Sequence, residues 1–282
     1  MRPTSASPTP RPASTRTPSL RPESGTGPTV EALAARLRAA GCVFAEDEAH
    51  LILQATDDEA LRDEMVNRRA EGAPLEVLLG WAELAGVRVS LLPGVFVPRR
   101  RSSLLVAQGL GALGPDGAVV VDLCCGSGAL GLALARARPD VELHAADLDE
   151  VACGCASENL RGIGEVHRGD LFDALPVDLR GRVDLLLVNA PYVPSAEVAH
   201  LPREARDHEP RVALDGGADG VDLHRRVADR AGEWVARGGT VLVETSERQA
   251  PSTAGAFDPD RWTVEVVTDD EIGATAVRAT RR

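Results

Sequence analysis

The sequence contains no lysine, so every basic side chain other than its histidines is an arginine. A lysine amine is the group that forms Schiff bases with carbonyl substrates, and that class of covalent catalysis is therefore excluded. Positive charge is also in the minority, because 31 arginines face 43 acidic residues and the formal net charge is -12. A protein that binds nucleic acid mainly through phosphates needs a basic face. The charge therefore argues against nucleic acid as a direct substrate.

Long apolar runs and metal-ligand spacings are absent as well. No run approaches the roughly 18 apolar residues that a membrane span requires, and the first residues lack the apolar core of a secretion signal. We expect a cytoplasmic protein with no membrane partner. The five cysteines form no C-x-x-C pair and are expected to be small buried hydrophobes. No two of the six histidines have ligand spacing, so the sequence predicts no metal site.

The composition of the first 28 residues differs from that of the rest. Pro, Ser, Thr and Arg dominate residues 1–28, which hold too little apolar surface to offset the entropy of ordering and are predicted to form a disordered tail. Helical periodicity then begins, with Leu33, Leu37 and Ala40 on one face and Gly41 as a stop. Two more helical patterns follow before residue 70. This part of the chain is predicted to be a small helical domain.

The remaining sequence has the alternation of an α/β protein. Apolar residues alternate from Leu84 to Val97 around Pro93-Gly94, which predicts a hairpin between two domains. Strand and helix patterns then follow one another, starting with a strand over Val119–Leu123, and predict a mainly parallel, doubly wound sheet. The predicted organisation is a tail over 1–28, a helical domain over 29–82, a hairpin linker over 83–103 and an α/β domain over 104–282.

A glycine-rich turn, Cys124-Cys125-Gly126-Ser127-Gly128, follows directly on the first strand of the α/β domain. Glycines there let the next helix begin close to a nucleotide-like ligand. With Gly131 the turn also satisfies G-x-G-x-x-G, a weak signal that fits a nicotinamide dehydrogenase almost as well. Asp122, the acid at the end of the strand, favours another ligand. It can orient the turn or a ligand ammonium group, and it would repel a pyrophosphate.

Two further acids follow the next strands. Asp147 ends the second strand about 20 residues beyond the turn, where a carboxylate can accept both hydroxyls of a ribose. Asp170 follows the predicted third strand, 165–168, and could accept from an adenine amino group. Capping a helix or lying in a solvated loop is the alternative for either acid. S-adenosylmethionine satisfies all three acids without a phosphate cradle, and this favours it over NAD.

The strongest signal is Asn189-Ala190-Pro191-Tyr192, directly after the apolar strand pattern Val183–Val188. An amide nitrogen is a poor nucleophile, so a site that methylates one must hold the NH2 group and present its lone pair. The Asn189 side-chain oxygen and the Ala190 carbonyl could accept its two hydrogens, and Tyr192 could stack on the planar group. No general base is obvious, so alignment and charge matching are the expected contributions. An ordinary strand-ending turn is the structural alternative.

These residues resemble the release factor glutamine methyltransferase family, which modifies the glutamine of a Gly-Gly-Gln loop. The similarity extends from about Ala32 to Arg278 and is carried by the glycine turn, by Asn189 to Tyr192 and by three flanking segments. Those segments are Arg68-Arg69-Ala70-Glu71-Gly72-Ala73-Pro74-Leu75, Gly94-Val95-Phe96-Val97-Pro98-Arg99 and His208-Glu209-Pro210-Arg211-Val212-Ala213-Leu214-Asp215-Gly216-Gly217.

The resemblance implies a class I methyltransferase, with a Rossmann-like seven-stranded sheet and an amino-terminal helical domain that helps to recognise a protein substrate. It also implies that Cys124 to Gly128, Asp147 and the region of Leu171 hold S-adenosylmethionine, with Asn189 to Tyr192 holding the substrate amide. A release factor, or another protein that bears a glutamine, is the implied partner.

The sequence departs from the family at three places. Ala190 stands where the first proline of Asn-Pro-Pro-Tyr is usual, Cys124 replaces a glycine, and Arg99-Arg100-Arg101-Ser102-Ser103 is basic where acidic residues are usual. The basic turn bears on the identity of the substrate more than on the chemistry, and Ala190 leaves the acceptor carbonyl in place. Two other hypotheses therefore stay open. One is an amino-group methyltransferase acting on adenine or guanine of RNA or DNA. The other is a homologue that binds the cofactor without catalysis.

Overall fold

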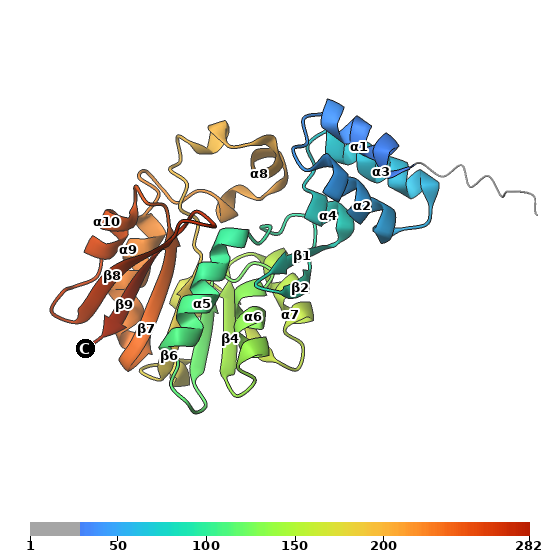
Figure 1. The fold of residues 1–282 in the computed structure, drawn as a ribbon. Coiled ribbons are helices and arrows are strands. Elements are labelled where there is room, and N and C mark those ends of the chain that lie inside the picture. Colours follow the sequence, from blue (N-terminus) through green and yellow to red (C-terminus); the bar gives the residue numbers. More distant parts are fainter. Residues whose placement is uncertain (1–28) are drawn as a thin grey trace, which may run out of the picture.

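The computed structural model of the chain describes residues 29–282, so the tail predicted for 1–28 lies outside the described residues (Figure 1). A seven-stranded sheet forms its body. Six of the strands run parallel, and β9 alone among the described strands of this sheet runs antiparallel to its two neighbours. In order across the sheet the strands are β5 (Gly164–Arg168), β4 (Glu142–Asp147), β3 (Val119–Leu123), β6 (Val183–Val188), β7 (Val235–Thr245), β9 (Ala274–Arg281) and β8 (Trp262–Asp269).

Helices cover both faces of this sheet (Figure 1). One face carries α5 (Ser103–Ala112), α6 (Ala129–Ala137) and α7 (Glu150–Asn159), and the other carries α9 (Asp222–Trp234) and α10 (Ala250–Gly255). The central strands are apolar at nearly every position because successive residues point to opposite faces. Val120 packs under the first group of helices and Val121 under the second, and both are fully buried. The predicted doubly wound α/β sheet is therefore confirmed.

A separate group of short helices precedes the sheet: α1 (Val30–Ala39), α2 (Ala45–Ala55), α3 (Glu59–Ala70) and α4 (Leu75–Leu79). The side chains of Thr29 and Asp58 accept hydrogen bonds from backbone N–H groups in the first turns of α1 and α3, which fixes where these helices begin. The helices share a small apolar core that includes Leu33 and Leu37. Ala40, predicted on the same buried face, is exposed because it caps the end of α1.

The hairpin prediction was wrong about the position of the turn. The two strands are β1 (Trp81–Leu84) and β2 (Val87–Ser90), joined at Ala85-Gly86, where both residues have positive φ (49° and 78°), as a tight two-residue hairpin turn requires. Pro93-Gly94 lies beyond the hairpin. Val95 and Val97 are buried but do not form a strand, because the Val97 N–H donates to the Glu209 carboxylate instead of to a neighbouring strand.

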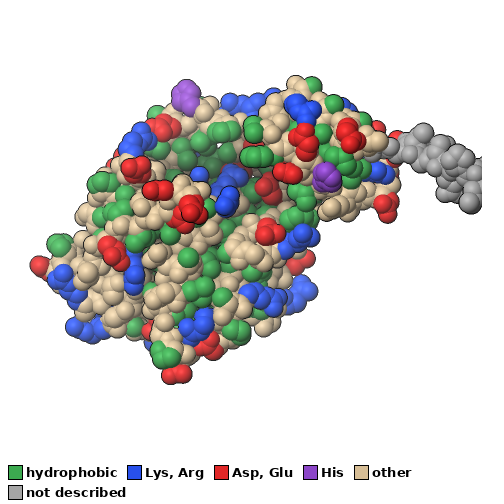
Figure 2. All heavy atoms as spheres, in the orientation of Figure 1, with side chains coloured by type: hydrophobic (Ala, Val, Ile, Leu, Met, Phe, Trp, Pro, Cys, Tyr) green, Lys and Arg blue, Asp and Glu red, His purple; other side chains and the backbone are tan. Residues whose placement is uncertain are grey.

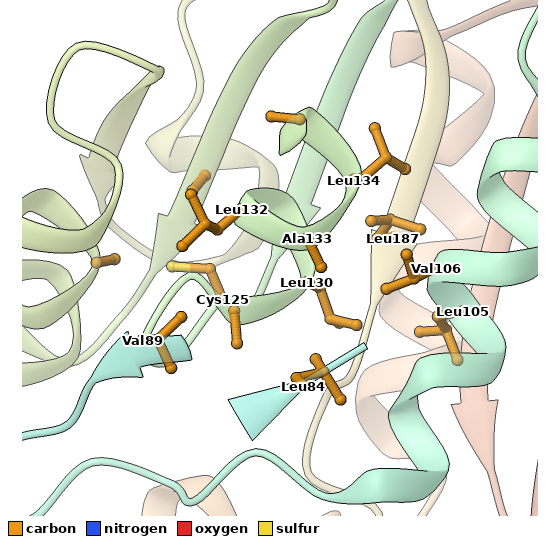
Figure 3. Packing of buried hydrophobic residues seen from close by; sticks show 14 of the residues in the cluster. Leu84, Val89, Leu105, Val106, Cys125, Leu130, Leu132, Ala133, Leu134 and Leu187 are labelled. Atoms are coloured by element: carbon orange, nitrogen blue, oxygen red, sulfur yellow. The ribbon is translucent and has the colours of Figure 1, made fainter. Parts of the chain in front are cut away.

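The hairpin packs on the face of the sheet that carries α5, α6 and α7, close to the start of α6 (Figure 3). Leu84 and Val89 contribute to the same buried cluster as Leu105 of α5 and Leu130 of α6. Another segment, from Val193 to Gly217, contains the short helix α8 (Arg203–His208), and we call it the α8 segment. It lies beyond the end of the sheet, near the helical group (Figure 1). In the described residues 29–282, no helix combines the length and the apolar character needed to cross a membrane.

Candidate active site

A cavity of about 730 Å³ opens at the carboxyl ends of β3, β4, β5 and β6. Figure 2 shows a hollow in this region of the surface, between the α8 segment and the body of the molecule. In an open parallel sheet this edge is where ligands bind, and the volume lies within the usual range for small-molecule sites. The turn after β3, the end of β4 and the residues after β6 all line it. The structure thus brings together most of the predicted site residues.

The glycine turn lies at the floor of the cavity. Its backbone is anchored to β4, because the Cys125 N–H donates to the Ala146 carbonyl (3.0 Å) and the Gly126 N–H donates to Asp147 Oδ2 (2.9 Å). Gly126 and Ser127 line the cavity together with Cys124 and Cys125. A Cβ at Gly126 would meet no atom within 4 Å, so the backbone there is open to a ligand. Cys124 has a φ of 59°, a conformation that glycine adopts more readily.

Neither Gly128, the last residue of the turn, nor Asp122 on β3 lines the cavity. Gly128 caps the start of α6 with a φ of 75°, and a Cβ there would lie 3.1 Å from the side chain of Leu160, which follows α7. Asp122 is fully buried, and its Oδ2 accepts the Gly131 N–H at 2.9 Å. Burial raises the pKa of this carboxyl to about 7. Asp122 is thus bonded to the first part of α6, and its predicted role in orienting the glycine turn stays a prediction.

Asp147 and Asp170 border the cavity at the ends of β4 and β5. Besides the Gly126 N–H, Asp147 accepts the N–H of Asp149 at 2.9 Å through Oδ1, and burial raises its pKa. Asp170 is half exposed and forms an ion pair with Arg226 (2.7 Å). Leu171, which follows it, has a φ of 50° and also lines the cavity. The acids therefore meet at one end of the cavity, as the strand pattern predicted.

The segment after β6 forms the other end. Asn189 lines the cavity, and its Nδ2 donates to Ser102 Oγ at 3.2 Å, which leaves Oδ1 as an acceptor for a ligand. Ala190 is buried and Pro191 is partly buried, and both border the same space. Because β6 lies beside β3, Asn189 follows the strand next to the one that leads into the glycine turn. The fourth-strand position predicted for this motif is confirmed.

Tyr192 is held by a buried carboxylate. Its hydroxyl donates to Glu244 Oε1 (3.1 Å), and the same oxygen accepts Arg101 Nε (3.2 Å). The Arg101 guanidinium lies 5.8 Å from the centre of the Tyr192 ring. Glu244 is 2% exposed, and its Oε2 has no hydrogen-bond partner among the described residues. Burial raises the pKa of Tyr192, so the phenol stays protonated and remains a donor.

Glycines in a distant loop support the backbone of this segment. Gly216 donates its N–H to the Val193 carbonyl (2.8 Å), and a Cβ on it would lie 2.6 Å from the Pro191 carbonyl oxygen. Gly220 approaches the Tyr192 carbonyl as closely, and Gln249 Nε2 donates to that same oxygen at 2.8 Å. Only residues without a Cβ fit these two approaches. The loop therefore sets where the predicted acceptor residues lie.

Comparison with known proteins agrees with this geometry. Residues 86–205 match the model of the methyltransferase small domain. A release factor glutamine methyltransferase from Streptomyces coelicolor is 37% identical over 76% of this chain and 77% of its own length. The chain belongs to the release factor glutamine methyltransferase family. It is thus an S-adenosylmethionine-dependent methyltransferase with the class I fold.

Two other proteins are similar to this chain, one in sequence and one in fold. A 4-amino-L-phenylalanine/4-methylamino-L-phenylalanine methyltransferase from Streptomyces pristinaespiralis is 34% identical over 70% of each chain. Among solved structures, a methyltransferase from Pyrococcus furiosus has a TM-score of 0.51 at 13% identity and covers 68% of this chain and 87% of its own. The latter similarity concerns the fold alone.

The residues of the cavity fit the cofactor of this family. S-adenosylmethionine carries a positive sulfonium and ammonium and no phosphate. The end of the cavity near the glycine turn is lined by acids, Asp147, Asp149 and Asp170, and Arg226 there is paired with one of them. The open backbone at Gly126 leaves room for a nucleoside. This acidic lining therefore suits a cationic nucleoside better than a pyrophosphate.

Four residues of this methyltransferase site were missed by the sequence analysis: Arg101, Ser102, Glu244 and Gln249. Each contacts the segment from Asn189 to Tyr192 from a position at least fifty residues away in the chain. The basic run at 99–101 was noted as a departure from the family, but its contacts were not foreseen. Glu244 gave a usable signal, because an acid that ends an apolar strand pattern at this edge of the sheet faces the ligand side.

The α8 segment closes the outer side of the cavity and connects it to the helical group. Leu201, Glu204 and Ala205 line the cavity. Arg69 of α3 forms ion pairs with Glu204 and with the buried Glu48 of α2. Arg99 pairs with Glu209 at the other end of α8. The helical group is therefore tied to the wall of the methyltransferase cavity.

Proposed function

We propose that the protein transfers the methyl group of S-adenosylmethionine to the side-chain amide nitrogen of a glutamine in a peptide chain release factor. The observation that carries this proposal is the fixed orientation of Asn189 at the cavity, where Ser102 holds its NH2 group and leaves its oxygen for a substrate. Family membership supports the same acceptor, since several relatives are named for it.

The end of the cavity near the glycine turn would hold the cofactor, which supplies an electrophilic methyl group on a sulfonium. We assign the contacts to Cys124, Cys125, Gly126, Ser127, Asp147, Asp170, Leu171 and Asn189. Asp147 would accept the two ribose hydroxyls, because its oxygens retain lone pairs beyond those used by the two backbone N–H groups. Asp122 and Gly128 would contribute indirectly, by fixing the turn and the start of α6.

The end formed by the segment after β6 would hold the acceptor amide. Asn189 Oδ1 and the Ala190 carbonyl would accept the two hydrogens of its NH2 group, so that the nitrogen lone pair faces the methyl. Pro191 would keep the backbone rigid, and the Tyr192 ring would pack against the planar amide. The Glu244 carboxylate, whose Oε1 accepts from Tyr192 and whose Oε2 has no partner among the described residues, would place negative charge near the nitrogen, which becomes positive during the transfer.

The helical region over 29–82 would recognise the release factor, and residues 83–103 would link it to the methyltransferase domain over 104–282. The ion pairs of Arg69 support this assignment, because they join the helices to the segment that borders the acceptor end. A protein acceptor is favoured over nucleic acid by the net charge of -12. We expect the protein to act in the cytoplasm, where release factors work.

The test is incubation of the full chain with methyl-labelled S-adenosylmethionine and the purified cognate release factor, followed by mass spectrometry of the Gly-Gly-Gln peptide. One added methyl group on that glutamine is expected. A release factor with this glutamine replaced by asparagine is the matched control and should stay unlabelled. Cofactor binding without transfer to any protein would favour a non-catalytic homologue. RNase-sensitive label in a lysate would favour a nucleic-acid amine.

An aromatic amine of a free amino acid is a second candidate acceptor. The observation that favours it is the similarity to the 4-amino-L-phenylalanine methyltransferase, whose named substrate also presents a nitrogen on a planar group. Adding 4-amino-L-phenylalanine to the same assay separates the two candidates. Faster transfer to this amino acid than to the release factor would reverse the assignment.

A further inference from the structure

Two histidines and a glutamate meet at the edge of the sheet, away from the cavity. His144 lies on β4, and Glu165 and His167 lie on the edge strand β5. In the parallel register His144 pairs with Glu165, and Ala146 pairs with His167. Residues two apart on a strand share a face, so all three side chains project from the same side of the sheet. A gap of 23 positions between the histidines hid this cluster from the sequence pattern.

The ligand atoms of the three side chains are close enough to share one ion. His144 Nδ1 lies 3.1 Å from His167 Nε2 and 3.9 Å from Glu165 Oε2, and all three atoms lie within 4.8 Å of one another. Two nitrogens bound to one tetrahedral zinc ion at about 2.0–2.1 Å are about 3.3 Å apart. The two imidazole rings are now joined by a hydrogen bond. A small rotation of each ring would bring both nitrogens to zinc-binding distance.

The surroundings of His144 orient it as a metal ligand. Its second ring nitrogen, Nε2, lies 3.1 Å from Glu142 Oε1, and Arg182 holds the other oxygen of that carboxylate at 3.0 Å. A carboxylate that accepts from the outer N–H of a ligand histidine fixes its tautomer and makes the inner nitrogen a better donor.

We propose that His144, Glu165 and His167 form a binding site for a divalent zinc ion that joins β5 to β4. Two imidazoles and a carboxylate suit zinc better than calcium or magnesium, which take oxygen ligands. His144 is buried, whereas the Glu165 side chain is 73% exposed. The ion would thus enter from solvent on the Glu165 side, and water would complete its coordination.

The proposed zinc site lies at the outer edge of the strands that carry the acids at the glycine-turn end of the cavity. Asp147 ends β4 three residues after His144, and Gly169 and Asp170 follow directly on β5. A zinc ion bound to both strands would therefore fix the position of Asp147 relative to Asp170. The Cys153 thiol is nearby but donates to main-chain carbonyls, so it is not counted as a ligand.

The test uses the untagged full chain, stripped of metal with a chelator and dialysed. Zinc is titrated calorimetrically, and Co²⁺ serves as a spectroscopic probe of the ligand set. We expect one equivalent of zinc, a tetrahedral Co²⁺ spectrum without a thiolate charge-transfer band, and a higher melting temperature with zinc. His167→Gln and Glu165→Gln should each weaken binding at least tenfold, and Glu142→Gln by about 10- to 100-fold.

His200→Gln is the matched control, because His200 is exposed and distant in the sequence from the cluster, and it should bind zinc as the wild type does. Glu165 is exposed, so Glu165→Gln should fold normally and keeps the test valid even if a histidine variant does not fold. Unchanged zinc affinity in both Glu165→Gln and His167→Gln, or a thiolate band with Co²⁺, would overturn the proposal. So would the absence of stoichiometric binding.

Discussion

The two ends of the cavity are built in different ways. The glycine-turn end comes mainly from one continuous stretch, a strand, a turn and a helix, together with Asp147 and Asp170, which end or follow the next two strands. The end formed by Asn189 to Tyr192 depends on contacts from afar: Ser102, Gly216 and Glu244 all touch it from distant positions. A local motif can keep its form while the rest of the chain changes. Support that is spread over the chain depends on the whole tertiary structure, so a change far away in the sequence can alter this end of the cavity.

The largest effect is expected for Asn189→Ala, which should impair methyl transfer at one end of the cavity without impairing cofactor binding at the other. Asn189→Ala removes the proposed acceptor for the substrate N–H and should lower kcat/KM for transfer about 10²- to 10³-fold, as loss of a preorganised transition-state contact does. The affinity for S-adenosylmethionine should stay within several-fold of wild type, as measured by calorimetry. Ser102→Ala, which only loosens Asn189, should have a smaller effect. A large loss of cofactor binding in Asn189→Ala would show that the two ends are not separable.

Gly216→Ala tests the long-range support. The added Cβ would lie 2.6 Å from the Pro191 carbonyl oxygen and 2.7 Å from the Tyr192 Cα, so backbone must move. We expect a loss of about 3 kcal/mol in the free energy of unfolding, at the upper end for overpacking, and impaired transfer. Gly111→Ala is the control, because a Cβ there meets no atom within 4 Å. Equal urea midpoints for the two variants would contradict the proposed role of Gly216.

Asp122→Asn tests the buried acid below the glycine turn through the pH dependence of stability. The folded-state pKa of about 7 lies above the ordinary 3.8, so the contribution of the protonated acid is complete below the ordinary value and is lost as the pH rises through 7. From about pH 5 to about pH 8, wild type should therefore lose about 2–3 kcal/mol that the variant keeps. Urea unfolding at both pH values measures this difference. Parallel curves for the two proteins would show that Asp122 ionises normally.

Asp147→Asn should act on the cofactor and not on the acceptor. An amide can still accept the Gly126 N–H but cannot replace both charged oxygens. The dissociation constant of S-adenosylmethionine should rise about 10- to 100-fold, the range for hydrogen bonds to a charged group. At saturating cofactor the transfer rate should be nearly normal. Asp170→Asn, whose carboxylate is shared with Arg226, should have a smaller effect.

The smallest effect is expected for Tyr192→Phe, which removes the only tyrosine hydroxyl of the chain. It deletes the hydrogen bond to Glu244 but leaves the ring, so kcat/KM should fall about fivefold, near 1 kcal/mol. Tyr192→Leu, which also removes the aromatic face, should lose more. If the two variants were equally impaired, the hydroxyl, and not the ring, would be the important part.

Much of the fold was predictable because it follows from local patterns. The central strands and the helices between them could be read from apolar periodicity, and β3 and β6 were predicted with the bounds that the structure shows. The hairpin was misread because two turn signals, Ala85-Gly86 and Pro93-Gly94, both interrupt the same alternation. Only the packing of Leu84 and Val89 against α6 selects the first. The short helices α4, α8 and α10 were missed because they are too brief for a periodic signal.

The sequence by itself determined the alternation of strands and helices, the glycine turn with Asp122 before it and Asp147 after it, and the position of Asn189 after the fourth parallel strand. Each of these features can be read from a short stretch of the chain. The tertiary structure decided which distant side chains complete them. Ser102 reaches Asn189, Glu244 reaches Tyr192, and His144 meets His167 only once the strands are paired in register. Strand order and register are properties of the whole sheet, so no local stretch of sequence contains them.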